Sequence, residues 1–363
     1  MNIKYLLISL KQTIYFFIRK KKYDFVLYSP SYFIIENKHL HFKSLINFFR
    51  KNNISFLYVE EPYKRNSKRS IDAYYFDFIF LLIVFFRKIF SGINYIENDK
   101  KIARLLRPLI RFKYKNIVTI SQSMISFFSE FDNDANIFDL QHGIIYKDKT
   151  SYLVDGNVSN NIILNNAKVL LFSEKYKRFL VDNEKGNYYK NNAIVIGNYL
   201  KKSNFLPKSN FNVIVSLQFT DSHNFKTNNI ILTSLFNTIK NNKEYSFFLL
   251  EHPRKNEFDI SKLIKLSNTK LVSENKNDLI KNCSIHYTCY STMAIDLAFK
   301  GIPTVFTDTK FSKKFIEDFD YPLDLNFNEV SQNFDKFSNE IREWSYQYFS
   351  KYSYDKLIHF IKQ

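Results

Sequence analysis

Short apolar runs rich in β-branched and aromatic residues alternate along the chain with longer segments of helical periodicity. This alternation predicts an α/β fold of βαβ units with parallel sheets, rather than a β-sandwich. The strands expected in the first half are 24–28, 55–59, 116–120, 136–140, 168–172 and 193–196. In the second half we expect strands at 213–217, 246–250, 270–272, 284–288 and 304–306, and helices at 228–240, 260–266, 278–282 and 292–299.

The pattern breaks in a polar stretch around Pro207, which is followed by a fresh apolar run. A chain of 363 residues is about twice as long as one hydrophobic core usually supports. We therefore predict two Rossmann-like domains, at 1–200 and 213–330, with a linker at 201–212 and a helical tail at 331–363 that packs back. The parallel sheets are expected to face a central cleft, because ligands of such sheets bind beyond the carboxyl ends of the strands.

Two apolar segments in the first half raise the question of membrane contact. Residues 3–18 are followed by the cations of 19–22, which reverses the charge order of a secretory signal, so we expect no signal peptide. The run 76–86 is shorter than the about 20 residues that cross a bilayer, and we expect a buried helix there. The N-terminal segment is either a plain surface helix or an amphipathic helix on an anionic leaflet.

Composition narrows the function classes. The hydrophobic fraction of 45% excludes wholesale disorder, and neither a GxGxxG nor a GxxxxGK[ST] motif occurs. Cys283 and Cys289 are the only cysteines and form neither a disulfide framework nor a zinc motif, so we expect a reduced, cytoplasmic protein.

The net charge of +18 predicts polyanionic partners. The cations are concentrated in residues 1–70, and Lys100, Arg104, Arg107 and Arg111 follow at helical spacing. No RNP-like, KH-like or zinc-knuckle pattern accompanies them, so nucleic acid is not expected as a partner.

The first half carries candidate bases at two predicted strand ends. His142 follows the strand at 136–140, and Gly143 lets the chain turn there. Histidine accepts a proton near neutral pH, so His142 is either a general base or a hydrogen-bonded structural residue. Glu60 and Glu61 leave the strand at 55–59 and are rival bases.

The second half places polar residues after three predicted strands. His252 and Arg254 follow the strand at 246–250, where Pro253 ends it, and this pair suits a phosphate. Ser291 and Thr292 stand where a strand passes directly into a helix, which suits either an anion or simple N-capping. The third set, Ser216 and Gln218, leaves the strand at 213–217.

The order His-Gly, His-Pro and Tyr-Ser-Thr at successive strand ends resembles bacterial GT-B transferases of surface polysaccharide and teichoic acid assembly. These comprise the CDP-glycerol glycerophosphotransferases, the polysialyltransferases and the capsule Kdo transferases. Residues 288–292 with Asp296 and Pro303 match the last block of the glycerophosphotransferases. Cys289 stands where that group has an acid, and Thr292 where it has a second serine.

The resemblance implies a GT-B glycosyltransferase-type enzyme. A sugar or polyol-phosphate unit would pass from a CMP- or CDP-linked donor to a capsule or O-antigen acceptor, lipid-linked or oligosaccharide, at the inner face of the plasma membrane. His142, or second Glu61, is the implied base. The implied donor residues in the C-terminal domain are His252, Arg254, Ser291, Thr292, Gln218 and Ser216.

No cofactor or metal is expected, because cations and dipoles offset the charge on the departing phosphate. The alternative is a UDP-sugar-dependent glycosyltransferase or epimerase-like enzyme of the same architecture.

Overall fold

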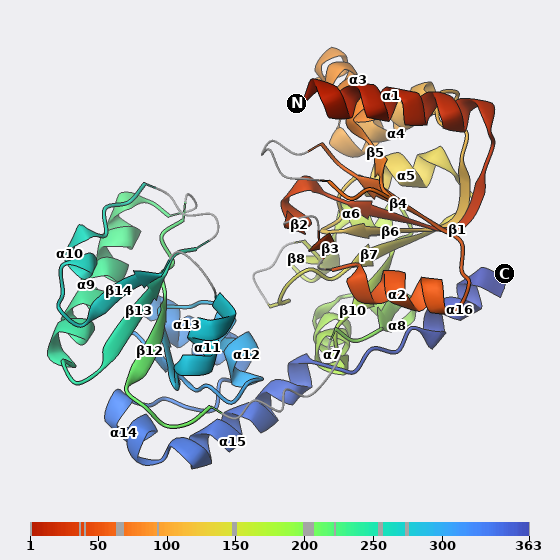
Figure 1. Ribbon diagram of the computed structural model, residues 1–363. Coiled ribbons are helices and arrows are strands. Elements are labelled where there is room, and N and C mark those ends of the chain that lie inside the picture. Colours follow the sequence, from red (N-terminus) through yellow and green to blue (C-terminus); the bar gives the residue numbers. More distant parts are fainter. Residues whose placement is uncertain are drawn as a thin grey trace. The chain divides into compact units, whose positions relative to one another are not determined.

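The computed structural model of the protein describes residues 2–35, 38–39, 41–62, 69–92, 94–146, 151–198, 207–220, 223–252, 257–272 and 276–362. It divides into two units (Figure 1). Unit 1 is Met1–Asn198 with Lys351–Gln363, and unit 2 is Tyr199–Ser350.

Unit 1 is built on a seven-stranded sheet in which every neighbouring pair is parallel. The order is β11 (Ala193–Val195), β10 (Lys168–Leu171), β7 (Asn136–Leu140), β6 (Lys113–Ile120), β1 (Lys22–Ser29), β4 (Phe56–Glu60) and β5 (Tyr74–Tyr75). The six strands predicted for this half are confirmed, each within three residues of the expected bounds. The two-residue edge strand β5 was not predicted.

Helices cover both faces of this sheet (Figure 1). On one face α2 (Lys43–Lys51) and α16 (Asp355–Lys362) share a core with Phe25 and Leu27 of β1. The other face carries α3 (Asp77–Ile89), α4 (Tyr95–Leu106) and α5 (Ile125–Phe131). The remaining elements of unit 1 are α1 (Ile3–Ile18), η1 (Ser31–Phe33), α6 (Asn160–Ile163), α7 (Glu174–Asn183), α8 (Tyr188–Asn192) and the hairpins β2 (Ile34–Ile35)/β3 (Lys38–His39) and β8 (Leu153–Val154)/β9 (Asn157–Val158).

Unit 2 holds a five-stranded parallel sheet that confirms all five predicted strands. Its order is β14 (Thr269–Val272), β13 (Ser246–Leu250), β12 (Asn212–Ser216), β15 (Ile285–Thr288) and β16 (Thr304–Phe306). One face packs on α9 (Phe225–Asn241), α10 (Ser261–Ile264) and α14 (Phe327–Gln332), the other on α11 (Lys276–Asn282) and α12 (Met293–Ala298). Further elements are α13 (Lys310–Phe319), α15 (Phe334–Ser345) and η2 (Tyr346–Tyr348).

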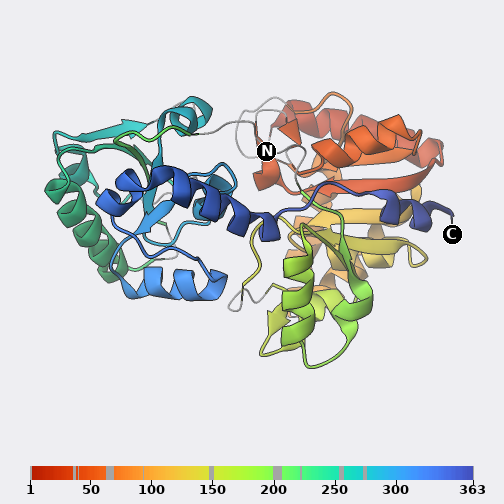
Figure 2. The ribbon, with the colours of Figure 1, turned by 90° about the horizontal axis from the view of Figure 1, so that it is seen from below.

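The expected C-terminal tail at 331–363 is divided between the units. Helix α15 packs on α12 in unit 2, whereas α16 belongs to unit 1, as the blue segment in Figure 2 shows. Tyr354 and Leu357 are buried in the core of unit 1, and the Ser353 N–H donates to the carbonyl of Ile196. The apolar residues of the last helix therefore complete the core of the N-terminal unit.

Helix α3 departs from the expectation of a buried helix at 76–86. Ile79 and Ile83 are fully buried, but Leu81 and Ile89 are exposed and Phe85 is 56% exposed. The helix lies at the β5 edge, where a two-residue strand and the neighbouring helices cover only one of its faces. Apolarity alone did not reveal this, because burial depends on what packs against the segment.

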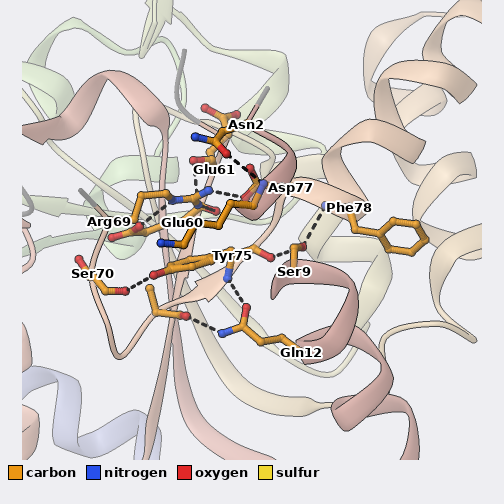
Figure 3. Close-up of polar contacts among 12 residues, drawn as sticks. Asn2, Ser9, Gln12, Glu60, Glu61, Arg69, Ser70, Tyr75, Asp77 and Phe78 are labelled. Atoms are coloured by element: carbon orange, nitrogen blue, oxygen red, sulfur yellow. Dashed lines mark hydrogen bonds and ion pairs between the residues drawn. The ribbon is translucent and has the colours of Figure 1, made fainter. Parts of the chain in front are cut away.

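A buried ion cluster holds the β5 edge of the sheet (Figure 3). The Arg69 guanidinium donates to the Glu60 carboxylate at 3.1 Å and also pairs with Asp77, and all three side chains are buried. It also donates to the Glu60 carbonyl at 2.8 Å and lies over the Tyr75 ring, 4.4 Å from its centroid. One arginine thus joins the end of β4, strand β5 and the first turn of α3.

We expect Arg69→Met to lower the free energy of unfolding by about 3–5 kcal/mol, because it leaves two buried carboxylates without their cation. Urea denaturation measures the change. The matched control is Arg50→Met, which removes an exposed pair with Asp72 and should cost less than about 1 kcal/mol. Equal losses in the two variants would contradict a structural role for the cluster.

Candidate functional site

The winding direction of unit 2 reverses between β12 and β15. From β12 the chain first builds outward through β13 to β14, then returns to the other side of β12 with β15 and β16. In sheets of this kind, ligands bind at the carboxyl ends of the strands beside the reversal. The groups that follow β12, β13 and β15 therefore define the candidate site of unit 2.

Three predicted donor residues lie at this edge. Gln218 follows β12, the middle strand, with His252 after β13 on one side and Ser291 after β15 on the other. Adjacent strands are about 4.8 Å apart, so the three positions span roughly 10 Å. Gln218 and Ser291 are buried and His252 is half-buried. Arg254 lies outside the described residues.

The turn into α12 uses its two hydroxyls differently. The Ser291 Oγ accepts a hydrogen bond from the Met293 N–H at 3.2 Å. Thr292 is exposed, has helical backbone angles and makes no capping hydrogen bond. With only six residues, α12 is too short for its N-terminus to define an anion site by itself. The structure thus supports the capping interpretation for Ser291, and a phosphate contact by Ser291 or Thr292 stays a prediction.

Ser216 is turned toward a histidine beneath the edge. Its Oγ lies 2.8 Å from His286 Nε2, and His286 Nδ1 lies 2.9 Å from the Thr304 hydroxyl. Complete burial lowers the pKa of His286 to about 3, so the ring is neutral. His286 hence fastens β12 to β15 and β16 below the candidate site, and Ser216 supports the edge from inside the sheet.

A second histidine meets the Tyr-Ser-Thr turn from the loop after β12. His223 lies between the Asn228 side-chain oxygen, 3.2 Å from Nδ1, and the Tyr290 hydroxyl at Nε2. An amide oxygen only accepts, so Nδ1 donates to Asn228. Sequence reasoning missed this pair, because 67 positions separate its members and no local motif links them.

Cys289, at the position where the resembling family has an acid, is buried. Its Sγ lies 3.2 Å from the hydroxyl of Thr309, the N-cap residue of α13. Thr309 in turn contacts the Ser312 hydroxyl at 2.9 Å. The thiol therefore holds the loop after β16 against β15.

A cavity of about 730 Å³ in unit 2 runs along α9 and reaches Asp308 and Thr309. None of the predicted donor residues lines it.

In unit 1, His142 follows β7 in a turn that is held by hydrogen bonds of a buried side chain. The buried Gln141 donates to the Gly143 carbonyl at 2.7 Å and accepts from the Phe172 N–H at 2.8 Å. The half-buried His142 ring packs on Phe33 of η1, with 5.3 Å between the ring centroids. The imidazole is thus held in one place at the carboxyl edge of the sheet.

The rival base Glu61 accepts hydrogen bonds from residues at the end of β1 and in the η1 turn. Its carboxylate accepts from the Tyr28 hydroxyl at 3.0 Å and from the Ser31 N–H at 2.8 Å. It thereby anchors the η1 turn that carries Phe33. Because three strand spacings separate β7 from β4, Glu61 and His142 leave the sheet about 14 Å apart.

The winding of unit 1 reverses between β1 and β6, one strand from His142. Directly after β6, three residues other than glycine adopt left-handed backbone: Ser121, Gln122 and Met124. Each such residue costs about 1 kcal/mol or more, and such residues cluster at functional sites. The Gln122 N–H donates to the Asp139 carboxylate at 2.6 Å, which also accepts from the Tyr152 hydroxyl. Sequence reasoning missed this turn, because no glycine marks it.

Within the described part of the chain, no group of three or more His, Cys, Asp or Glu side chains is placed to hold a metal ion. None of the described helices is both long and apolar enough to span a bilayer. Metal-independence and cytoplasmic location stay predictions.

Comparisons with known proteins extend the fold assignment. No protein-family model and no curated protein matches the sequence. The structure of a UDP-GlcNAc 2-epimerase from Neisseria meningitidis bound to UDP-GlcNAc is similar over 94% of this chain and 99% of that chain, with a TM-score of 0.53 and 12% identity. The S. aureus MnaA–UDP structure is similar over 95% and 96%, with a TM-score of 0.54 and 12% identity.

At this identity the two comparisons show the fold alone. Two Rossmann-like units in this order confirm the predicted fold class, that of GT-B proteins. The placement of the two sheets about a cleft stays a prediction, as does membership of the glycerophosphotransferase, polysialyltransferase or Kdo transferase groups.

Acid should weaken the fold through His286. An unfolded histidine gains its proton near pH 6.5, whereas folded His286 stays neutral down to about pH 3. Between these values the unfolded chain binds more protons, so the free energy of unfolding falls by about 1 kcal/mol per pH unit as the pH drops. Urea titrations should show a smaller loss in His286→Asn than in wild type. The exposed control His359→Asn should keep the full loss, and identical slopes for all three proteins would refute this role.

Proposed function

We propose that the protein is a nucleotide-sugar-dependent GT-B enzyme that transfers a glycosyl unit from a UDP-linked donor to a saccharide acceptor. The observation that supports the donor site is the position of Gln218, His252 and Ser291 after three adjacent strands at the winding reversal of unit 2. UDP is preferred to the cytidine nucleotides first expected, because the two similar structures hold UDP-GlcNAc and UDP.

Transfer requires charge stabilisation on the departing diphosphate. The Gln218 amide and the His252 ring are donors that suit phosphate oxygens, and the half-buried edge strengthens such contacts. In the sequence the cationic Arg254 stands two positions after His252. The proposal needs no divalent ion, because these groups provide the opposing charge and dipoles.

The acceptor hydroxyl must lose a proton, and we assign this step to His142. Its ring is held by Phe33 and by the Gln141 turn, which limits its motion at the sheet edge. A fixed imidazole whose usual pKa is near 6.5 suits general-base catalysis at neutral pH. Glu61 we assign a positioning role, because its oxygens already hold the turn that carries Phe33.

A UDP-sugar 2-epimerase is the second candidate, favoured by the near-complete overlap of the chain with the structure of one such enzyme. The two activities differ in their need for an acceptor. An epimerase converts UDP-GlcNAc to its C2 epimer alone, whereas a transferase releases UDP when an acceptor saccharide is present. Capsule, O-antigen and lipid-linked acceptors belong to the transferase proposal.

UDP should raise the melting temperature of the wild-type protein in excess EDTA, since a ligand that binds only the folded state stabilises it. His252→Ala and Gln218→Ala should each weaken UDP binding by about tenfold, the effect of one hydrogen bond to a charged group. Thermal shift against UDP, CMP, CDP and GDP measures this. The control is Lys243→Ala, at an exposed position in the loop between α9 and β13. If His252→Ala and Gln218→Ala both bind UDP as tightly as this control, the donor does not bind at this edge of unit 2.

Measurements of kcat distinguish the base role of His142 from the positioning role of Glu61. His142→Ala should lower kcat by about a hundredfold or more while UDP affinity is retained, because only proton transfer is lost. Glu61→Gln should keep most activity, since an amide oxygen still accepts from the Ser31 N–H. UDP release in the presence of an acceptor saccharide gives both values. Full activity in His142→Ala with loss in Glu61→Gln would reverse the assignment.

A further inference from the structure

Helix α1 packs on the rest of unit 1 through Ser9, Thr13 and Phe16 and exposes a row of apolar side chains on its other side. Ser9, Gln12 and Thr13 face unit 1: Gln12 bonds the Ala73 carbonyl and the Tyr75 N–H, both at 2.9 Å, and so completes the edge of β5 (Figure 3). On the opposite side Ile3, Leu7, Ile14 and Ile18 are exposed. At 100° per residue these four lie within about 60° of one another around the helix axis.

Helix α3 continues this surface. It packs beside α1, and the Phe78 N–H donates to the Ser9 hydroxyl at 2.9 Å (Figure 1). Among its exposed residues, Leu81, Phe85 and Ile89 recur every four positions and so form one row. Lys4 and Lys11 on α1 and Lys88 on α3 are exposed beside these apolar residues. We call the seven apolar residues of α1 and α3 the apolar face.

A cationic pocket adjoins the end of α1. Its volume is about 300 Å³, and six of its ten lining residues are cations: Lys20, Lys21, Lys22, Arg107, Arg111 and Lys113. Asp132 is the one acid among those lining residues. The Arg111 guanidinium lies over the ring of Phe17, 4.4 Å from its centroid, so the pocket joins the C-terminal end of α1 directly.

We propose that the apolar face and the cationic pocket together dock unit 1 on an anionic phospholipid bilayer. Exposed aliphatic and aromatic residues beside lysines are the surface that enters the boundary between headgroups and acyl chains. Six cations around one pocket match the lipid phosphates, and each cation near such a surface adds about 1 kcal/mol of attraction. The inward polar residues of α1 explain how the helix stays folded on unit 1 while it presents its apolar side.

Charge complementarity favours an anionic bilayer over a second copy of this chain as the occupant. A face that docks on a second copy of this chain would bring two sets of these cations together, which costs free energy. The proposal does not depend on the donor site, since every residue involved belongs to unit 1.

The test is co-sedimentation of the full chain with phosphatidylglycerol–phosphatidylcholine vesicles and with pure phosphatidylcholine vesicles. Wild type should pellet with the anionic vesicles and be released by salt. Leu7→Glu/Phe85→Glu and Lys20→Glu/Lys22→Glu/Arg107→Glu should each weaken binding by at least about tenfold. The matched controls in unit 2 are Ile264→Glu and Lys243→Glu/Lys262→Glu/Lys265→Glu, all at exposed positions, and they should bind like wild type.

A second measurement does not rely on loss of binding. In Phe85→Trp, brominated phosphatidylglycerol should quench the new indole, whereas in Ile264→Trp the added fluorescence should be unaffected. The proposal would be overturned if the apolar-face variant and the cationic-pocket variant both bound vesicles as well as wild type does. An unquenched indole at position 85 would overturn it too. A stable wild-type dimer that Leu7→Glu/Phe85→Glu dissociates would also overturn it. The UDP-induced thermal shift of each variant, which should equal that of wild type, reports the donor site separately.

Discussion

The constraint on which the candidate site depends is the parallel pairing of strands that are wound in two directions from one starting strand. Parallel pairing places every carboxyl end on the same edge, and the reversal separates the helices that follow β12 and β15, as it does for β1 and β6. Residues far apart in the sequence, such as Gln218 and Ser291, are thereby brought to one place. Without that arrangement, single polar residues after single strands would have no common ligand.

At both edges the protein uses some polar groups for its own structure. Ser216 is engaged by His286, Ser291 by its own helix, Cys289 by the N-cap of α13, and Glu61 by the turn after β1. These contacts hold the backbone beside Gln218, at the Tyr-Ser-Thr turn and in the η1 turn that carries Phe33. Some polar groups thus serve the fold and others are left for the ligand. This is physically reasonable, because a site that binds a charged donor requires groups already held in position.

The β5 edge of unit 1 shows a different solution to an exposed sheet edge. The two-residue strand is closed by the Gln12 side chain and by the buried Arg69 cluster, so the helix that covers it needs an inward polar face. Ile3, Leu7, Ile14 and Ile18 of α1 are left on the outside. The same packing leaves a row of α3 uncovered, and the two helices pack against each other.

The sequence by itself determined the order of strands and helices and the residues at their ends, because period-2 and period-3.6 patterns and strand-ending residues such as Pro253 are local signals. The positions of His142, His252, Gln218 and Ser291 directly after strands were predicted on this basis. The tertiary structure decided what depends on distant contacts: the pairing of His223 with Tyr290, the burial of His286, the strained turn at Gln122 and the outward face of α1. A local pattern records which residues are apolar or polar, whereas only the packed chain determines which surface each of them meets.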